Sequence, residues 1–421
     1  MNGKRRTANG ERQTVNGKSV IVVGAGAAGT MAAIFAASKG ADTRLLERTK
    51  DGGRKILISG GGRCNILPVE VDESRFVTDS SPHTLRRMVR SWPLGEQIAF
   101  FEEELQLPLV EERESAKLFP QSQRARDVRD KLFACARRKG VQILTDTLVT
   151  GVVPRGAGWI VERHAGDPLE ADAVILATGG LSVPQTGSDG RGLEMARHLG
   201  HAIHPTYAAL TPLLSKGLLF KELSGVSLRV TITARSNGRS AEATGGFLFT
   251  HEGFSGPAVL DVSHVAVRSL SDAREPAAID VRWSTLGDRD WEEALRPKAS
   301  RTVLAAVGAA LPHRLAEALV LAAGIEADRQ RSQLTRAERL GLIELLVRTP
   351  LEWSGHEGYK KAEVTGGGVG LGEIDPRTME SRRHKGLFLC GEMLDAFGPI
   401  GGYNFLWAWA TGRAAGIGAA R

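Results

Sequence analysis

The chain has 421 residues, of which 42% are hydrophobic, and a formal net charge of +7. This length exceeds what one hydrophobic core usually serves, so we expect two or three domains. The three cysteines, Cys64, Cys135 and Cys390, form no C-x-x-C pair. Their scatter suggests neither a disulfide framework nor a zinc site, and it fits a reducing cytoplasm best.

Residues 1–18 are polar and basic and lack the apolar segment of a secretory signal, so we expect a disordered basic tail. The stretch 19–37 is apolar enough for a membrane span, but its glycine spacing fits a strand, a turn and a helix better. No other segment is a candidate span. We therefore expect a cytoplasmic protein with no membrane partner.

The first folded segment reads as an apolar strand, the loop G-x-G-x-x-G, a helix and a second strand that ends in an acid. In a dinucleotide site Gly24 allows the tight turn, Gly26 lets the backbone approach the pyrophosphate, and Gly29 lets helix and strand pack closely. Glu47 lies 18 residues beyond Gly29, a spacing typical of an acid that binds adenosine ribose hydroxyls. We assign to cofactor binding the residues Gly24, Gly26, Ala27, Ala28, Gly29, Glu47 and Arg48.

Two later segments indicate which dinucleotide is bound. An apolar run from Ala173 ends in Ala-Thr-Gly-Gly, and a second run from Gly386 ends in Gly-Glu. In order with the first unit, they resemble the signatures of two-dinucleotide-binding-domain flavoproteins. That resemblance implies FAD, with the first run beside the adenine half and the second reaching the ribityl chain and flavin. The residues it adds are Thr178, Gly179, Gly180, Gly391 and Glu392.

A closer resemblance rests on longer motifs at residues 53–65, 118–122, 177–190, 249–257, 365–369 and, the most specific of them, 391–409. They are similar to the YhiN/BaiN-type family of bacterial FAD-dependent oxidoreductases, which includes an aminoacetone oxidase. The similarity runs from about residue 19 to residue 416. It implies a Rossmann-like α/β fold and an oxidoreductase activity that uses FAD.

A run of three glycines follows the first unit. Such a run exposes backbone N–H groups and permits a close approach that a Cβ would block. Apolar residues precede it and polar residues follow it, so we favour a wall on the flavin side over a flexible turn. We assign to this wall Arg54, Lys55, Ser59, Gly60, Gly61, Gly62, Arg63, Cys64 and Asn65, with Arg63 and Asn65 as hydrogen-bonding candidates.

Gly401 and Gly402 lead into the final helix, which Tyr403 and Asn404 begin. If its N-terminus faces the flavin pyrimidine, the helix would stabilise the negative charge that reduction places at N1 and the C2 oxygen. In that interpretation Asn404 is either a helix cap or a direct flavin ligand. The alternative is a capped structural helix with core tryptophans.

Two residues are candidates for catalysis, and for each a structural role is the favoured alternative. Cys64 follows Arg63, which would favour a thiolate, but with no resolving cysteine nearby a packed thiol is the better interpretation. His251 is an acid or base candidate because imidazole titrates near neutral pH, yet a lone histidine is more often structural. No pattern supports a metal site or a hydrolase.

From about residue 205 the pattern changes to strand-like pieces at 228–234, 246–249 and 277–283, then helical periodicity at 291–310, 314–324 and 334–346. The flavoprotein signatures stop before this block and resume after it. We therefore predict an α/β, Rossmann-like two-dinucleotide-binding-domain flavoprotein fold with a β-then-α insert. Residues 19–204 and 347–421 would bind FAD, and 205–346 would form the substrate or cap domain. The alternating stretch 141–162 predicts a small β-meander.

We predict an FAD-dependent oxidoreductase that acts on a small organic molecule in the cleft between these parts. Only one G-x-G-x-x-G occurs, so an NAD(P)H donor would have to enter that cleft directly; O2 is an alternative acceptor. The positive net charge raises a second possibility, an RNA-binding or RNA-modifying flavoprotein. A flavin protein with a structural or regulatory role is a third. Acids and apolar positions interleave with the arginines of residues 124–139, which favours an amphipathic helix over an RNA surface.

Overall fold

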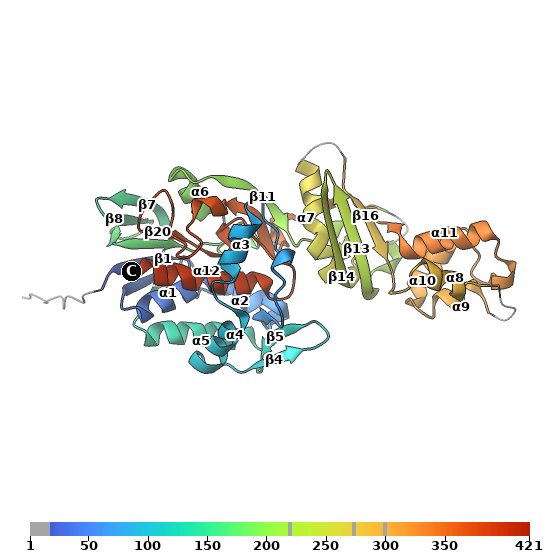
Figure 1. Ribbon diagram of the computed structural model, residues 1–421, viewed down its shortest axis with the longest axis horizontal. Coiled ribbons are helices and arrows are strands. Elements are labelled where there is room, and N and C mark those ends of the chain that lie inside the picture. The colour runs from blue at the N-terminus through green and yellow to red at the C-terminus, as the bar shows by residue number, and fades with distance from the viewer. Residues whose placement is uncertain (1–16, 218–220, 272–274, 298–300) are drawn as a thin grey trace, which may run out of the picture.

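The computed structural model describes residues 17–217, 221–271, 275–297 and 301–421. The tail expected over residues 1–18 lies outside these residues, apart from its last two. The described chain forms two lobes arranged along the long axis of the molecule (Figure 1). The first lobe contains both the start and the end of the described chain, and the second lobe is inserted between them.

A five-stranded parallel sheet forms the centre of the first lobe. Its strand order is β20-β10-β1-β2-β6, with bounds Leu387–Leu389, Ala173–Leu176, Ser19–Val23, Asp42–Leu46 and Gln142–Leu144. Val22 on β1 lies opposite Ile175 on β10 and Leu45 on β2. The strands are short and apolar because helices or a second sheet cover both of their faces.

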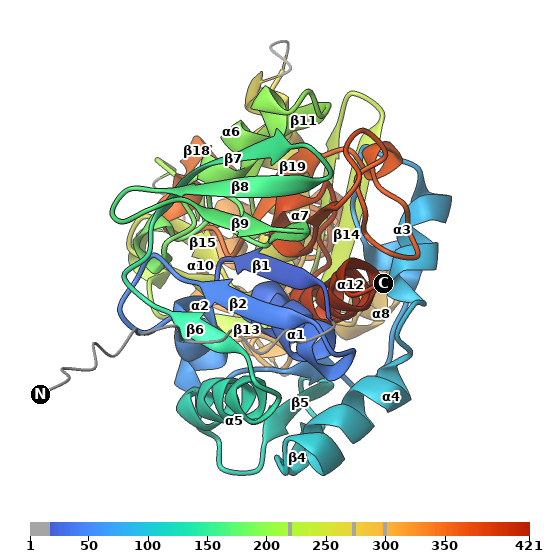
Figure 2. The ribbon, with the colours of Figure 1, turned by 90° about the vertical axis from the view of Figure 1, so that its left-hand side faces the viewer.

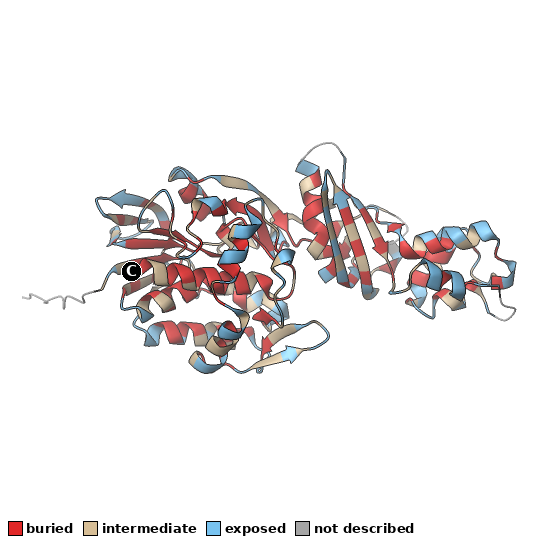
Figure 3. Cartoon of the chain, viewed as in Figure 1, coloured by how far each residue is buried: buried red, intermediate tan, exposed pale blue. Residues whose placement is uncertain are grey.

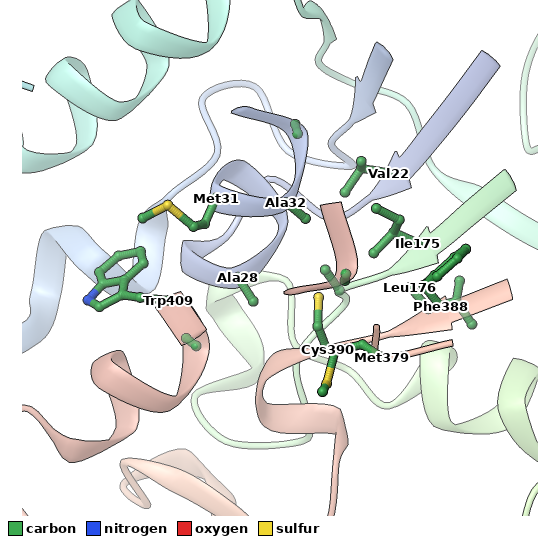
Figure 4. Packing of buried hydrophobic residues seen from close by; sticks show 14 of the residues in the cluster. Val22, Ala28, Met31, Ala32, Ile175, Leu176, Met379, Phe388, Cys390 and Trp409 are labelled. Carbon is green, nitrogen blue, oxygen red and sulfur yellow. The ribbon is translucent and has the colours of Figure 1, made fainter. Parts of the chain in front are cut away.

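Two helices cover one face of this sheet and pack closely together, α1 (Ala27–Ser38) and α12 (Tyr403–Ala419) (Figure 2). A Cβ added to Gly412 or Gly416 of α12 would lie 2.3 or 2.2 Å from a backbone oxygen of α1, so glycine sets this close approach. Figure 4 shows Ala28 and Ala32 of α1 between sheet residues and Trp409. Because α12 is buried over most of its surface, it is apolar on all sides.

Smaller elements complete the first lobe. A meander of β7 (Val149–Arg155), β8 (Gly158–Arg163) and β9 (Leu169–Ala171) covers the other face of the sheet (Figure 2). The meander expected over 141–162 was therefore placed too early, because β6 pairs with β2 in the parallel sheet. The remaining elements are α2 (Arg54–Ile58), β3 (Leu67–Pro68), α3 (Pro82–Val89), α4 (Leu94–Ala99), β4 (Leu109–Glu112), β5 (Lys117–Pro120), α5 (Ala125–Arg138) and α6 (Arg191–His198).

The second lobe contains a seven-stranded antiparallel sheet. Its order is β17-β16-β13-β14-β15-β12-β18, with bounds Thr349–Pro350, Ala278–Arg282, Ser227–Ser236, Arg239–Phe249, Gly253–Ser255, Leu213–Leu214 and Gly355–His356. Helix α7 (Pro257–Ser271) packs against β13 and β14 on the side toward the first lobe (Figure 1). At the far end lie α8 (Asp288–Ala294), α9 (Val303–Val307), α10 (His313–Ala322) and α11 (Arg336–Val347).

The helix expected over 291–310 is instead two short helices, α8 and α9. Thr302 begins α9 as an N-cap whose side chain accepts a hydrogen bond from the Ala305 N–H at 3.2 Å. A threonine in this position starts a new helix because it satisfies an N–H group that has no partner within the helix. Helical periodicity alone did not reveal this new start.

The lobes are joined by a strand pair, β11 (Ile203–Ala209) with antiparallel β19 (Val364–Val369). A small apolar cluster sits at this junction and includes Ala209, Leu210, Val364 and Phe397. Each lobe also has its own large buried cluster (Figure 3). The junction is therefore made of hydrogen-bonded strands rather than open loops.

Candidate functional site

A cavity of about 390 Å³ opens at the carboxyl ends of the parallel strands. Its lining runs from Glu47 and Arg48 after β2, past the loop before α1, to Gly401 and Gly402 before α12. In open α/β sheets this edge is the usual ligand site. The cavity lining therefore joins the segment after β2 to the loop before α12, the two regions that a dinucleotide site would need.

Most of the predicted site residues line this cavity. They are Gly24, Gly26, Ala27, Ala28, Glu47, Arg48, Arg54, Lys55, Ser59, Gly60, Gly61, Asn65, Thr178, Gly179, Gly391, Glu392, Gly401, Gly402 and Asn404. The others lie outside its lining: Gly29, Gly62, Arg63, Cys64, Gly180, Tyr403 and His251.

The loop before α1 is shaped to receive a ligand. Gly24 has φ +102°, and a Cβ added to Gly29 would lie 1.9 Å from the Gly24 oxygen, so both positions require glycine. A Cβ on Gly26 would meet no protein atom within 4 Å and would project into open space. Helix α1 has no side-chain cap and no acid in its first turn. Its N-terminal N–H groups and positive dipole end are therefore open to an anion.

Helix α12 also begins at the cavity. Its N-cap, Gly402, has φ +94°, and a Cβ there would lie 2.5 Å from the Leu67 carbonyl carbon. The helix has neither a side-chain cap nor an acid in its first turn. The Asn404 amide instead bonds both the N–H and the C=O of Gly398 at 2.9 Å. Tyr403 points away from the cavity and contacts the backbone of residues 70 and 72.

Charged groups at the other end are held in place by the protein. Glu47 accepts hydrogen bonds from the Ala25 N–H at 2.9 Å and from the Thr49 N–H and hydroxyl. Arg48 pairs with Asp189, and Arg191 approaches the same carboxylate at 3.0 Å. The sequence motif at 177–190 contains Asp189, but sequence reasoning assigned it no role.

A polar network lies between the two ends. Lys55 Nζ lies 2.5 Å from Glu392 Oε2 and donates to the Ser182 hydroxyl at 2.7 Å. Ser182 and Thr365 donate to the other oxygen of Glu392. Four separate segments of the chain therefore meet at Glu392. Lys55 and Glu392 were predicted, while Ser182 and Thr365 were not, because their pairing depends on long-range contacts.

The burial of Cys64 argues against the catalytic thiolate that was considered for it and against a place in the flavin-side wall. Its thiol is fully buried, and burial raises the pKa of Cys64 to about 12. The neighbouring Arg63 turns outward, where it stacks 4.2 Å from the Phe119 ring centroid and pairs with Glu112 at 2.7 Å. The favoured alternative, a packed thiol, is what the structure shows.

His251 is exposed on the turn between β14 and β15, and its Nδ1 lies 3.2 Å from the Ser224 hydroxyl. It belongs to the second lobe and is absent from the cavity lining. This placement does not supply an acid or base to the cavity.

Comparison with known proteins agrees with this geometry. The model of the HI0933-like protein Rossmann domain matches residues 18–418. The chain belongs to this family. It is 34% identical to the 3-dehydro-bile acid delta(4,6)-reductase of Clostridium scindens, over 95% of this chain and 98% of that protein. It is 33% identical to the ribosomal RNA dihydrouridine synthase of Escherichia coli, over 93% and 95%.

A solved structure shows the same fold. The 3-ketosteroid delta1-dehydrogenase of Sterolibacterium denitrificans superposes with a TM-score of 0.53 at 12% identity, over 96% of this chain and 100% of that chain. The predicted family and fold class are confirmed, and the HI0933-like chain is a flavin-dependent oxidoreductase. In the described residues, no helix is long and apolar enough to cross a membrane, and no group of three or more His, Cys, Asp or Glu side chains could hold a metal.

Sequence reasoning missed two acids at the α12 end. Glu363 lines the cavity, and its side chain is exposed to the cavity space. Desolvation by the surrounding protein raises the pKa of the Glu363 carboxyl. Asp261 on α7 accepts a hydrogen bond from the Ile400 N–H at 2.7 Å, and burial raises its pKa to about 6. The position of Glu363 two residues before the motif at 365–369 was the available signal. Asp261 had none.

Proposed function

We propose that this HI0933-like protein binds FAD and reduces a carbon–carbon double bond conjugated to a carbonyl group in a small organic molecule. The observation that carries the proposal is the pair of helix N-termini without side-chain caps, those of α1 and α12, that line one cavity. Such ends favour negative charge at two separate points, as the pyrophosphate and the reduced flavin of FAD require.

The residues present fit FAD. The space beside Gly26 admits a pyrophosphate, and Glu47 with Arg48 provides polar groups for the adenosine half. Gly401 and Gly402 bring backbone close to the flavin half, and the Lys55–Glu392 pair fixes the wall between them. The bound flavin would supply two-electron chemistry, and these residues hold, orient and shield it. We propose residues 19–204 and 358–421 as the FAD-binding domain, with a later second start than the predicted residue 347, because β17 and β18 pair within the sheet of the second lobe.

The substrate class comes from two relatives with different substrates. A delta(4,6)-reductase acting on a 3-dehydro-bile acid and a dihydrouridine synthase both have names that describe saturation of a double bond conjugated to a carbonyl group. Because the two relatives share this chemistry but not a substrate, we propose an enone-type substrate and neither of the two individual molecules. We propose that the substrate binds where residues 205–346 meet the end of the cavity at the N-terminus of α12, near Ile400 and Asp261.

An anaerobic half-reaction tests this function. The purified holoprotein is reduced with NADH, NADPH or dithionite, then mixed with cyclohex-2-enone or a 3-oxo-Δ4 steroid, and flavin absorbance is followed. Cyclohexanone, which has no double bond, is the matched control. We expect reoxidation by the enones alone, with a product two hydrogens heavier. Reoxidation by O2 but by no enone would show an oxidase or a non-catalytic flavin protein instead.

A second candidate is an RNA-modifying flavoprotein, favoured by the name of the Escherichia coli relative and by the net charge of +7. Ribosomal RNA is the test ligand. Binding that weakens steeply with salt, together with dihydrouridine formation, would favour this candidate. Turnover of small enones without RNA turnover would favour the first.

A further inference from the structure

We propose that Glu363 holds the proton that the substrate receives when its double bond is saturated. This inference rests on the proposed reduction of an enone. It assigns an acid to a site in which neither Cys64 nor His251 serves, because one is a buried thiol outside the lining and the other is exposed on the second lobe.

The cavity lining contains few side chains that could donate a proton to a substrate. The lining acids are Glu47, Asp189, Glu363 and Glu392, and the lining contains no His, Cys or Tyr. Glu47 bonds Ala25 and Thr49, Asp189 pairs with two arginines, and Glu392 belongs to the Lys55 network. Among the described contacts, the Glu363 carboxyl has no hydrogen bond or ion pair. Because the Glu363 side chain is open to the cavity and has no protein partner, its carboxyl is available to a ligand bound there.

Glu363 lies where the two lobes meet. Its backbone N–H donates to Leu210 O at 3.1 Å, at the start of β19 and the junction of the lobes. Val364 beside it, and Ile400 and Gly401 before α12, line the same end of the cavity. Glu363 therefore stands between the flavin end and the second lobe, where a substrate in contact with both would lie.

The surroundings of Glu363 favour the protonated form of its carboxyl. Desolvation raises the pKa of Glu363, while Lys117 of β5 and Lys55 of α2 lower it. Lys55 is neutralised by Glu392, so Lys117 is the main opposing charge. Asp261 of α7 faces the same end, with Arg75 3.9 Å from its carboxylate. Lys117 also lies beside the loop before α12, because its Cε would be 3.6 Å from a Cβ added to Gly401.

The step balances with one proton from Glu363. Saturation breaks the carbon–carbon π bond and forms two C–H bonds. Two electrons and one proton reach the β-carbon from the reduced flavin, and the second proton passes from the Glu363 carboxyl oxygen to the α-carbon. The products are the saturated carbonyl compound, oxidised flavin and a Glu363 carboxylate. A reduced nicotinamide would reduce the flavin again, and water would return a proton to the Glu363 carboxylate.

The holoenzyme and its Glu363→Gln variant provide the test, with Glu111→Gln, an exposed acid outside the cavity lining, as control. We expect Glu363→Gln to keep its FAD and its rate of reduction by dithionite. Reoxidation by cyclohex-2-enone should slow at least about a hundredfold, the usual contribution of a positioned acid. Glu363→Asp should recover part of the rate. Reoxidation of the Glu363→Gln variant within about threefold of wild type would overturn the proposal.

A second readout needs no substrate. The flavin reduction potential is measured against pH by spectroelectrochemistry. A carboxyl that ionises beside the flavin should give the wild type and Glu111→Gln a break above the ordinary glutamate range, and Glu363→Gln should lack that break. Coincident curves for wild type and Glu363→Gln would overturn the proposal. A break without enone turnover would overturn both the proposed substrate class and the donation to it, while showing that Glu363 ionises beside the flavin.

Discussion

The two lobes differ in the parts of the chain that face the cavity and the junction between the lobes. In the first lobe, backbone forms much of the cavity: glycine loops and two helix N-termini approach where side chains would block. In the second lobe, an antiparallel sheet and a helical cluster present side chains, such as Asp261, to the junction. A site that is built from backbone groups requires glycine at fixed spacings, so it leaves a motif in the sequence. A site that is built from side chains requires no fixed spacing. The sequence therefore indicates the cofactor but does not indicate the substrate.

The largest expected effect separates the stability of the lobes. Trp291 is fully buried in the core of the second lobe. Trp291→Ala should lower the free energy of unfolding of that lobe by about 4 kcal/mol, because it leaves a large cavity. Flavin absorbance should persist at temperatures where circular dichroism already shows the second lobe melting. Leu340→Ala, at a position 45% exposed, is the control and should change little. Simultaneous loss of flavin and structure would mean that the lobes unfold as one unit.

A substitution at Gly26 tests the cofactor side of the comparison. Gly26→Val should fold normally, since φ at Gly26 is −81° and no protein atom lies within 4 Å of an added Cβ. The new side chain would occupy the pyrophosphate space, so FAD affinity should fall at least about a hundredfold, or about 3 kcal/mol. Isothermal titration of the apoprotein measures it. Gly95→Val is the matched control, because Gly95 also has open space around its Cβ position and lies outside the cavity lining. Equal affinity in both variants would mean that the cofactor binds elsewhere.

The same contrast explains what the sequence could predict. Gly24, Gly29 and Gly402 were identifiable because each occupies a position where a Cβ would clash with backbone. The parallel strands were predictable as short apolar runs between glycine turns. The direction in which Arg63 and Tyr403 point was not, because stacking on Phe119 and contacts with residues 70–72 arise only when distant segments meet.

Side-chain networks were also beyond the sequence. Lys55, Ser182, Thr365 and Glu392 come from four segments, and each has many other polar residues at similar sequence distances. Glu363 carries no motif of its own, although a recognised motif begins two residues later. The role that we propose for Glu363 rests on its place in the cavity lining and on a carboxyl without a hydrogen bond or ion pair, which only the folded chain can reveal.

Asp261 provides a pH test of the junction between the lobes. Its pKa of about 6 in the folded protein lies above the ordinary value of 3.8, so the neutral form is the one the fold stabilises. The stabilisation is complete below about pH 4 and is lost as pH rises through about 6. Asp261→Asn stays neutral and still accepts from Ile400. It should therefore be more stable than wild type by about 2 kcal/mol at pH 7 and equal to it at pH 4. Urea unfolding at both pH values measures this, and a constant difference would contradict the assignment.

The smallest expected effect distinguishes the two halves of the cofactor. Glu47→Gln removes the negative charge at the adenosine end but keeps the shape of the side chain, and its oxygen still accepts from one of its present donors. We expect FAD affinity to fall about tenfold, or about 1.4 kcal/mol, as for the loss of one charged hydrogen bond. FMN lacks the adenosine half, so its weaker binding to the apoprotein should not change. Fluorescence titration of apo wild type and Glu47→Gln with each flavin gives both values. If FMN affinity fell as much as FAD affinity, Glu47 would act by holding the loop at Ala25 in place, and the ribose role predicted from its spacing would be wrong.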